Sequence, residues 1–89
     1  MVVLVTGSSK GIGYQIASDL LDQGHDLVLH CNRNKSSLEG LLSAYKSNSV
    51  IIQADLSSYN DIKKLVDETI NKLSFPDCVI NNAGIAESA

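Results

Sequence analysis

A glycine-rich segment near the N-terminus has the residue types and spacing of a phosphate-binding turn. Residues 6–13 read Thr-Gly-Ser-Ser-Lys-Gly-Ile-Gly and follow a short aliphatic run. We expect Gly7 to allow a sharp turn, Gly11 to let the backbone approach a pyrophosphate, and Gly13 to let a helix pack closely on a strand. The first N–H groups of that helix would then face the anion. The segment lacks the Gly-Lys-Ser/Thr triplet of a P-loop, so it predicts a dinucleotide ligand.

Polar side chains in this turn and at two later positions extend the predicted contacts. The hydroxyls of Ser8 and Ser9 could bond phosphate or ribose oxygens, and Lys10 adds a positive charge. A second polar segment, Asn81-Asn82-Ala83-Gly84, follows another hydrophobic run. Asp55 also follows such a run, and by residue type alone it could bind a ligand or only cap the next turn.

Four short hydrophobic runs alternate with segments of helical periodicity. The runs are rich in Val, Ile and Leu, which is typical of strands buried on both faces, and they cover residues 2–5, 27–29, 50–52 and 78–80. Alternating strands and helices need right-handed crossovers and form a parallel sheet with helices on both faces. We therefore predict an α/β fold of the Rossmann type with strand order 3-2-1-4. The two glycine-containing motifs then meet at the carboxyl ends of neighbouring strands, where such folds bind ligands.

The three segments between the strands carry apolar stripes at helical spacing. The stripes consist of Ile12, Ile16, Ala17, Leu20 and Leu21, then Leu38, Leu41, Leu42 and Tyr45, then Ile62, Leu65, Val66, Thr69, Ile70 and Leu73. Gly24 is expected to end the first helix. Ser58 is expected to cap the third, with Asp61 three residues later as in a capping box.

Composition and charge exclude several other classes. The chain is 44% hydrophobic and 19% charged with a net charge of −3, and its seven Lys and Arg are too few for a nucleic-acid surface. No apolar run approaches the roughly 20 residues that cross a bilayer, and no signal peptide precedes the first strand. Cys31 and Cys78 have neither metal nor disulfide spacing. We expect packed thiols in a cytoplasmic protein without a metal.

The glycine turn and the Asn-Asn-Ala-Gly segment together resemble the double signature of the short-chain dehydrogenase/reductase family, over nearly the whole chain. The resemblance implies that Asp55 bonds the adenine amino group, with Leu56 beside it, and that Asn82 contacts the adenine-side ribose. It also implies that the remaining residues of the segment shape the strand end and bring backbone close to the cofactor; these are Asn81, Ala83 and Gly84.

The end of the second strand bears on the choice between NAD and NADP. NAD-selective relatives carry an acid there that binds the ribose hydroxyls, whereas residues 30–33 read His-Cys-Asn-Arg. NADP-using members of the family place basic residues at the positions of Lys10 and Arg33, which can pair with a 2′-phosphate. Asn32 would add a neutral hydrogen bond, and His30 is expected to be packed or close to the adenosine. We therefore predict NADP(H) as the cofactor.

The predicted cofactor-binding set contains no catalytic residue and consists of Gly7, Ser8, Ser9, Lys10, Gly11, Ile12, Gly13, Asn32, Arg33, Asp55, Leu56, Asn81, Asn82, Ala83 and Gly84. The family's catalytic serine and Tyr-x-x-x-Lys lie beyond the fourth strand. Tyr59 and Lys63 have the right spacing but fall too early in the chain. We therefore interpret residues 1–89 as the N-terminal dinucleotide-binding part of a reductase whose catalytic part is absent. The fourth strand and the third helical stripe should then be partly uncovered.

The residues of this sequence indicate the cofactor more directly than they indicate the substrate. The opening and the Asn-Asn-Ala-Gly-Ile segment most resemble 3-oxoacyl-(acyl-carrier-protein) reductases, which implies a carbonyl or acyl-carrier-bound substrate reduced by NADPH. Pteridine-type reductases are the nearest alternative, because residues 27–30 resemble their second strand. The full-length form is expected to be a homo-oligomer with no nucleic-acid or membrane partner. A truncated, inactive dinucleotide-binding module is the alternative from a different class.

Overall fold

The four hydrophobic runs form one parallel sheet, as predicted. The computed structural model describes residues 1–83 of the chain. Its strands are β1 (Val2–Thr6), β2 (Asp26–Cys31), β3 (Val50–Gln53) and β4 (Cys78–Asn81), in the order β3-β2-β1-β4. All three strand pairings are parallel. This confirms the Rossmann-type order, and β1 and β4 are neighbours whose carboxyl ends lie at the same edge.

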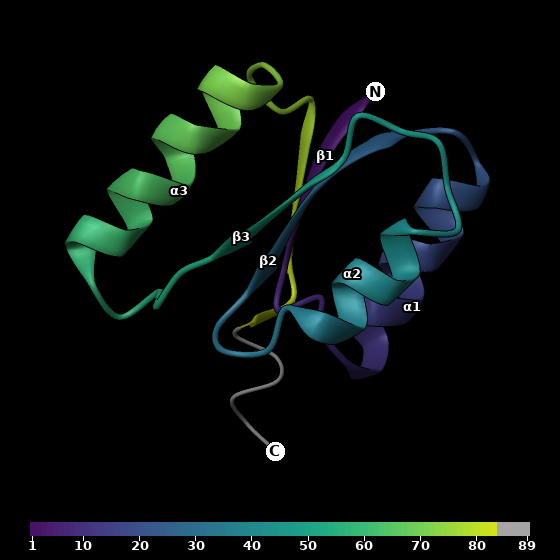
Figure 1. Cartoon of the computed structure of the whole chain (residues 1–89). Coiled ribbons are helices and arrows are strands. Elements are labelled where there is room, and N and C mark those ends of the chain that lie inside the picture. The colour runs from purple at the N-terminus through teal and green to yellow at the C-terminus, as the bar shows by residue number, and fades with distance from the viewer. Residues whose placement is uncertain (84–89) are drawn as a thin grey trace.

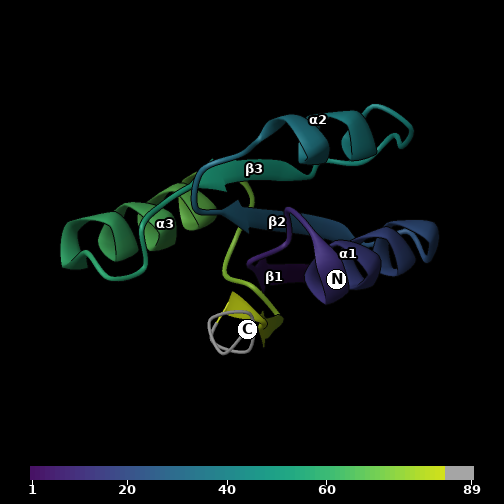
Figure 2. The ribbon, with the colours of Figure 1, turned by 90° about the horizontal axis from the view of Figure 1, so that it is seen from below.

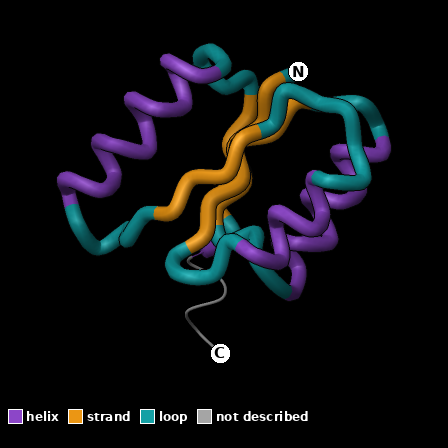
Figure 3. Tube along the Cα trace, in the orientation of Figure 1, coloured by secondary structure: helices purple, strands orange, loops and turns teal. Residues whose placement is uncertain are grey.

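The helices cover the two faces of the sheet unequally. Helices α1 (Gly11–Asp22) and α2 (Ser36–Leu42) pack on one face, and α3 (Tyr59–Lys72) packs on the other (Figures 1 and 2). This arrangement follows from right-handed crossovers, because the chain moves outward from β1 to β3 and then returns to β4. Figure 3 shows the strands running into loops at both ends of the sheet, and the carboxyl ends of all four strands lie at the same end. That end holds both glycine-containing motifs.

Side chains of β2 alternate between two cores, because successive residues of a strand point to opposite faces. Leu27, Leu29 and Cys31 pack with the α1–α2 layer, and Val28 packs with Ile52 in the α3 layer. Every residue from 27 to 31 is therefore buried. This two-sided burial explains why β2 has no polar alternation.

Helix α1 is rotated differently from the prediction. Its buried face consists of Gly13, Ala17 and Leu21, whereas Ile12 is 66% exposed. The rotation follows from Gly13, which has no side chain and lets the helix approach the sheet at that point. Ile12 then projects away from the core, so its place at the start of the predicted stripe was wrong. Gly24 has φ +88°, as expected of the residue that ends the helix.

The second helix is shorter than its predicted stripe, because α2 ends at Leu42 and Tyr45 reaches the core from the turn beyond it. In α3 the Ser58 side chain caps the helix as predicted, accepting from the Asp61 N–H. The Asp61 carboxylate does not return to Ser58, as a capping box requires. It accepts instead from the Asp55 N–H at 2.8 Å, which ties α3 to the end of β3.

The face of α3 and the outer strand β4 are partly uncovered, which confirms that prediction. Only Leu65 and Thr69 of the α3 stripe are buried, while Val66 is 48% exposed and Val79 of β4 is 55% exposed. Cys78 is exposed as well, contrary to the expected packing, because β4 lies at the sheet edge. Among residues 1–83, no helix has the length and apolar character needed to cross a membrane.

We predict that Gly13→Ala destabilises the fold. A Cβ at Gly13 would overlap the Gly7 carbonyl oxygen and lie 2.5 Å from the Asn82 amide nitrogen. Overpacking of this kind lowers the free energy of unfolding by about 1–3 kcal/mol. Gly40→Ala is the matched control, because a Cβ there meets nothing within 4 Å in α2. Urea denaturation should show a loss for Gly13→Ala and a gain of roughly 0.5–1 kcal/mol for Gly40→Ala. Equal stability of the two variants would contradict the packing argument.

Candidate functional site

The ends of β1 and β4 are joined by a set of hydrogen bonds centred on Thr6. Its hydroxyl oxygen accepts the N–H groups of Asn82 at 3.0 Å and Ala83 at 3.2 Å, and lies 3.2 Å from the Asn81 Oδ1, to which it can donate. The Asn82 side-chain amide donates to the Gly7 carbonyl at 3.0 Å. The described residues of the two motifs are therefore brought together, as the predicted strand order implied. Their hydrogen bonds connect the end of β1 to the end of β4.

Asn82 has a structural role that sequence patterns did not reveal. Its side chain is buried, and its NH₂ group holds the Gly7 carbonyl from beneath the turn. The ribose contact implied by the family resemblance stays a prediction. Gly84, the last residue of the predicted set, lies outside the described residues.

The glycine turn leaves open space in front of α1. Gly7 and Gly11 have φ values of +62° and +64°, which favour glycine. A Cβ at Gly11 would meet nothing within 4 Å, so the backbone is accessible there. The side chain of the N-cap residue Lys10 makes no capping hydrogen bond within residues 1–83, in contrast to Ser58 at α3. The first turn of α1 thus has the uncapped donors and the open approach that an anion needs.

The Ser8 hydroxyl differs from the prediction, whereas the predicted ligand contact of the Ser9 hydroxyl stays a prediction. Ser8 is fully buried, and both its N–H, at 2.9 Å, and its hydroxyl, at 3.0 Å, donate to the His30 carbonyl. The expectation that the Ser8 hydroxyl bonds a ligand was therefore wrong, because that hydroxyl holds the turn to β2. Ser9 is half-buried, and its carbonyl accepts from the Ser37 hydroxyl at 2.7 Å. Ser37 at the start of α2 was not predicted to belong to the site.

His30 lies beneath the turn at the end of β2. Its Nδ1 accepts the Gly7 N–H at 2.9 Å, and its Nε2 lies 2.8 Å from the Ala54 carbonyl oxygen. The ring is buried. The sequence left open whether His30 is packed or close to the ligand site. In the structure His30 is packed and also lies at the candidate site, because its buried ring borders two cavities.

Two cavities open at the carboxyl ends of the strands. The first, of about 520 Å³, we call the Asp55 cavity, and its lining includes His30, Asp55, Leu56, Asn81 and Ala83. The second, of about 570 Å³, we call the Arg33 cavity, and its lining includes Gly7, Ser9, Lys10, His30, Arg33 and Ser37. Asn32 lines both. Predicted site residues from three strand ends and from the glycine turn thus line two cavities that share His30, Asn32 and Ala83.

The carboxylate of Asp55 both caps a turn and lines its cavity. Oδ1 accepts the Ser57 hydroxyl at 2.6 Å and the Ser57 N–H at 2.9 Å. These bonds, the hydroxyl first, hold the pKa of the Asp55 carboxyl below its ordinary value. No hydrogen bond to Oδ2 is found within residues 1–83. The two readings of Asp55 are therefore compatible, because one oxygen holds the turn and the other remains for a ligand.

Positive charge at this end of the sheet comes from Lys10 and Arg33. Both side chains are exposed, and both line the Arg33 cavity. The ion pairs of residues 1–83 all lie on α3 and involve neither of them. No group of acidic, His and Cys side chains within the described residues could hold a metal ion. The two cations make the Arg33 cavity suited to an anion.

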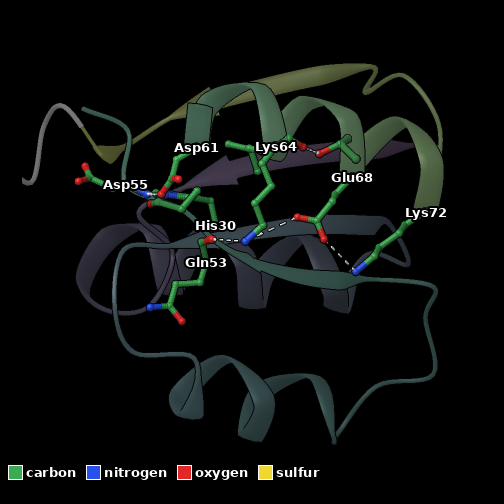
Figure 4. A network of polar contacts seen from close by, with 10 residues as sticks. His30, Gln53, Asp55, Asp61, Lys64, Glu68 and Lys72 are labelled. Atoms are coloured by element: carbon green, nitrogen blue, oxygen red, sulfur yellow. Dashed lines mark hydrogen bonds and ion pairs between the residues drawn. The ribbon is translucent and has the colours of Figure 1, made fainter. Parts of the chain in front are cut away.

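The charged groups of α3 form a separate network at the side of β3 (Figure 4). Glu68 lies 3.3 Å from the Lys72 ammonium and 3.9 Å from that of Lys64, which also donates to the Gln53 carbonyl at 3.4 Å. On the same helix, Tyr59 is 76% exposed and Lys63 pairs with a carboxylate one turn later. Tyr59 and Lys63 line neither cavity. The structure thus places this pair away from both cavities, and its exclusion from catalysis stays a prediction.

Comparisons with known proteins agree with this geometry. A family model described as short chain dehydrogenase matches residues 1–89. Curated relatives include 11-beta-hydroxysteroid dehydrogenase A of Sesamum indicum, 39% identical over 94% of this chain and 25% of that protein. NADPH-dependent pterin aldehyde reductase of Arabidopsis thaliana is 36% identical over 92% of this chain and 34% of that protein. The 3-oxoacyl-(acyl-carrier-protein) reductase FabG of Staphylococcus epidermidis is 31% identical over 94% of this chain and 36% of that protein.

A solved structure shows the same arrangement of strands and helices. A dehydrogenase/reductase from Sinorhizobium meliloti 1021 superposes with a TM-score of 0.80 at 28% identity, over 90% of this chain and 33% of that one. The chain thus spans between 25% and 36% of the length of these proteins. The family model covers every residue of the sequence and the fold agrees with it, so the chain belongs to the short-chain dehydrogenase family.

Proposed function

We propose that the chain binds NADP(H) and forms the dinucleotide-binding part of a carbonyl reductase. The observation that carries the proposal is the Arg33 cavity, where the glycine turn, Lys10 and Arg33 face the same open space. A phosphate in this space would meet two cations that pair with no protein carboxylate within residues 1–83. When bound, NADPH supplies the hydride that reduces a carbonyl carbon.

The residues present fit the parts of the dinucleotide in a consistent order. The Asp55 cavity suits the adenine, because the ionised Asp55 can accept from an amino group and the half-buried Leu56 offers an apolar surface. The Arg33 cavity suits a 2′-phosphate, which Arg33 and Lys10 would neutralise. The uncapped N-terminus of α1 suits the pyrophosphate.

The residues at the end of β2 favour NADP over NAD. No acid occupies residues 30–33, so nothing there repels a 2′-phosphate. The pterin aldehyde reductase that resembles this chain is described as NADPH-dependent, which supports the same cofactor. Each surface cation alone would be weak evidence, because exposed cations are usually only solvated. Their shared cavity makes the pair informative.

For the substrate we propose a 3-oxoacyl group. The similarity to the 3-oxoacyl-(acyl-carrier-protein) reductase supports it, and the similarity to the pterin aldehyde reductase supports a pteridine carbonyl as the second candidate. The catalytic groups would come from residues outside the printed sequence, acting in a cytoplasmic homo-oligomer. Assay of the full-length protein with NADPH and either a 3-oxoacyl thioester or a pterin aldehyde tests the two candidates directly.

Lys10 and Arg33 should determine the preference for NADPH over NADH. The double variant Lys10→Ala with Arg33→Ala should weaken NADPH binding by about a hundredfold or more, since each charge-assisted hydrogen bond contributes about 1.5–3 kcal/mol. NADH binding should change by less than about threefold, because NADH lacks the 2′-phosphate. Fluorescence titration measures both affinities. Lys46→Ala, at an exposed lysine outside both cavities, is the matched control. Equal losses for NADPH and NADH would refute the assignment.

The hydrogen bonds from Ser57 should control the pKa of the Asp55 carboxyl. Ser57→Ala should raise the pKa of the Asp55 carboxyl toward its ordinary value, because the largest cause of the lowering is the Ser57 hydroxyl. With the folded pKa below the unfolded one, these bonds stabilise the fold above the ordinary carboxyl pKa. Their contribution is lost as pH falls through the lowered value. An NMR titration of the carboxyl carbon measures the pKa. Ser43→Ala should leave it unchanged, and an ordinary pKa in the natural chain would contradict the assignment.

Tyr59 and Lys63 should take no part in catalysis. The 89-residue chain should not oxidise NADPH in the presence of a 3-oxoacyl thioester, because Tyr59 and Lys63 lie away from both cavities. In a longer protein that contains this chain, Tyr59→Phe should leave kcat unchanged. The decrease in nicotinamide absorbance measures turnover. Turnover by the 89 residues that Tyr59→Phe abolishes would show that this pair is catalytic after all.

A further inference from the structure

The buried histidine beneath the glycine turn joins three segments that are distant in sequence. His30 is only 2% exposed. Its ring contacts Gly7 through Nδ1 and the Ala54 carbonyl through Nε2, and its own carbonyl accepts twice from Ser8. One residue of β2 therefore ties the β1–α1 turn to the end of β3.

The partners of the ring determine its protonation pattern. The Gly7 N–H is a donor, so Nδ1 must present a lone pair to it. The Ala54 carbonyl is an acceptor, so Nε2 must carry the hydrogen. A neutral ring with its hydrogen on Nε2 satisfies both partners. No other form of the ring does so.

The position of the ring relates this bonding to the ligand site. His30 lines the Asp55 cavity and the Arg33 cavity, and thus lies between the groups suited to adenine and those suited to a 2′-phosphate. Figure 4 shows it beside the end of β3, where Asp55 follows. A change at His30 would release the Gly7 amide on one side and the Ala54–Asp55 backbone on the other.

We propose that His30 is a positioning residue for the dinucleotide: its Nδ1 holds the Gly7 N–H and so the glycine turn in place for the bound cofactor, while the Ala54 bond fixes the tautomer that can accept it. The inference rests on the proposed function, because it assumes that NADP(H) occupies the two cavities. His30 is not a catalytic residue. It acts through the backbone of Gly7 and Ala54, and through the turn that carries Ser8 and Lys10.

Three substitutions separate this role from simple filling of space. His30→Phe keeps a ring but removes both bonds. His30→Asn places an acceptor near Nδ1 and can keep the Gly7 bond, while His30→Gln reaches toward Ala54 and gives up the Gly7 bond. Asn and Gln thus each lose one hydrogen bond and the ring. A purely structural role would lower their Tm and their NADPH affinity in parallel.

We expect NADPH affinity to follow the Gly7 bond rather than Tm. Fluorescence titration of the full chain should show NADPH affinity reduced by about tenfold or more in His30→Phe and His30→Gln. This is the effect expected of one unpaired buried donor, the Gly7 N–H. His30→Asn should stay within about threefold of the natural chain. Circular dichroism gives Tm for each variant. If His30→Phe does not fold, the Asn and Gln pair still decides the question.

A measurement without cofactor tests the geometry itself. Nitrogen NMR of the unliganded protein should show His30 as the neutral tautomer with its hydrogen on Nε2, with the half-buried His25 as internal reference. A hydrogen on Nδ1 would overturn the proposal. So would NADPH affinities of the Asn and Gln variants that simply follow their Tm, or a folded His30→Phe that binds like the natural chain. Absence of NADPH binding by the natural chain would instead overturn the proposed function, and the role of His30 with it.

Discussion

The candidate site depends on the close approach of α1 to the ends of β1 and β4 at Gly13. Gly13 faces the Gly7 carbonyl and the Asn82 amide with no room for a Cβ. Because the helix touches the sheet at this point, its N-terminus opens directly over the strand ends. The conformation of the glycine turn, the open space in front of α1 and the hydrogen bonds to the Thr6 hydroxyl all depend on this close packing. A larger residue at Gly13 would separate the parts of the site from one another.

Polar groups at this end of the sheet divide into two sets. The buried ones, Ser8, His30 and Asn82, have hydrogen-bond partners within the protein, as burial requires. The exposed ones, Lys10 and Arg33, are outside the ion pairs of residues 1–83 and face the Arg33 cavity. The first set gives the site its shape, and the second gives it charge. A preorganised site of this kind loses little entropy when a ligand binds.

The α3 side of the sheet is built differently. Leu65 is well buried there, whereas Val66 and Val79 keep about half of their surfaces exposed. The ion pairs along α3 are exposed and contribute little stability. The cluster on the α1–α2 side is larger and fully buried at β2. The most rigid part of the molecule should therefore be the layer that carries the glycine turn.

Much of the fold followed from local rules. Continuous aliphatic runs identified the four strands, and right-handed crossovers placed β1 beside β4. The sharp turn at Gly7, where φ is +62°, was implied by its place after the first strand. The edge of the sheet where the site would form was therefore predictable, as were the charges of Lys10 and Arg33.

The roles of individual polar residues needed the tertiary structure. Ser8 and its carbonyl acceptor are 22 residues apart, His30 and Ala54 are 24 apart, and Asn82 and Gly7 are 75 apart. No local pattern specifies partners over such distances, so Ser8 looked like a ligand contact and His30 stayed undecided. The sequence by itself determined the fold, the end of the sheet that carries the site and the charge that the site offers. Only the tertiary structure decided which polar groups are used up in holding the turn, because hydrogen bonding between distant segments depends on how they pack.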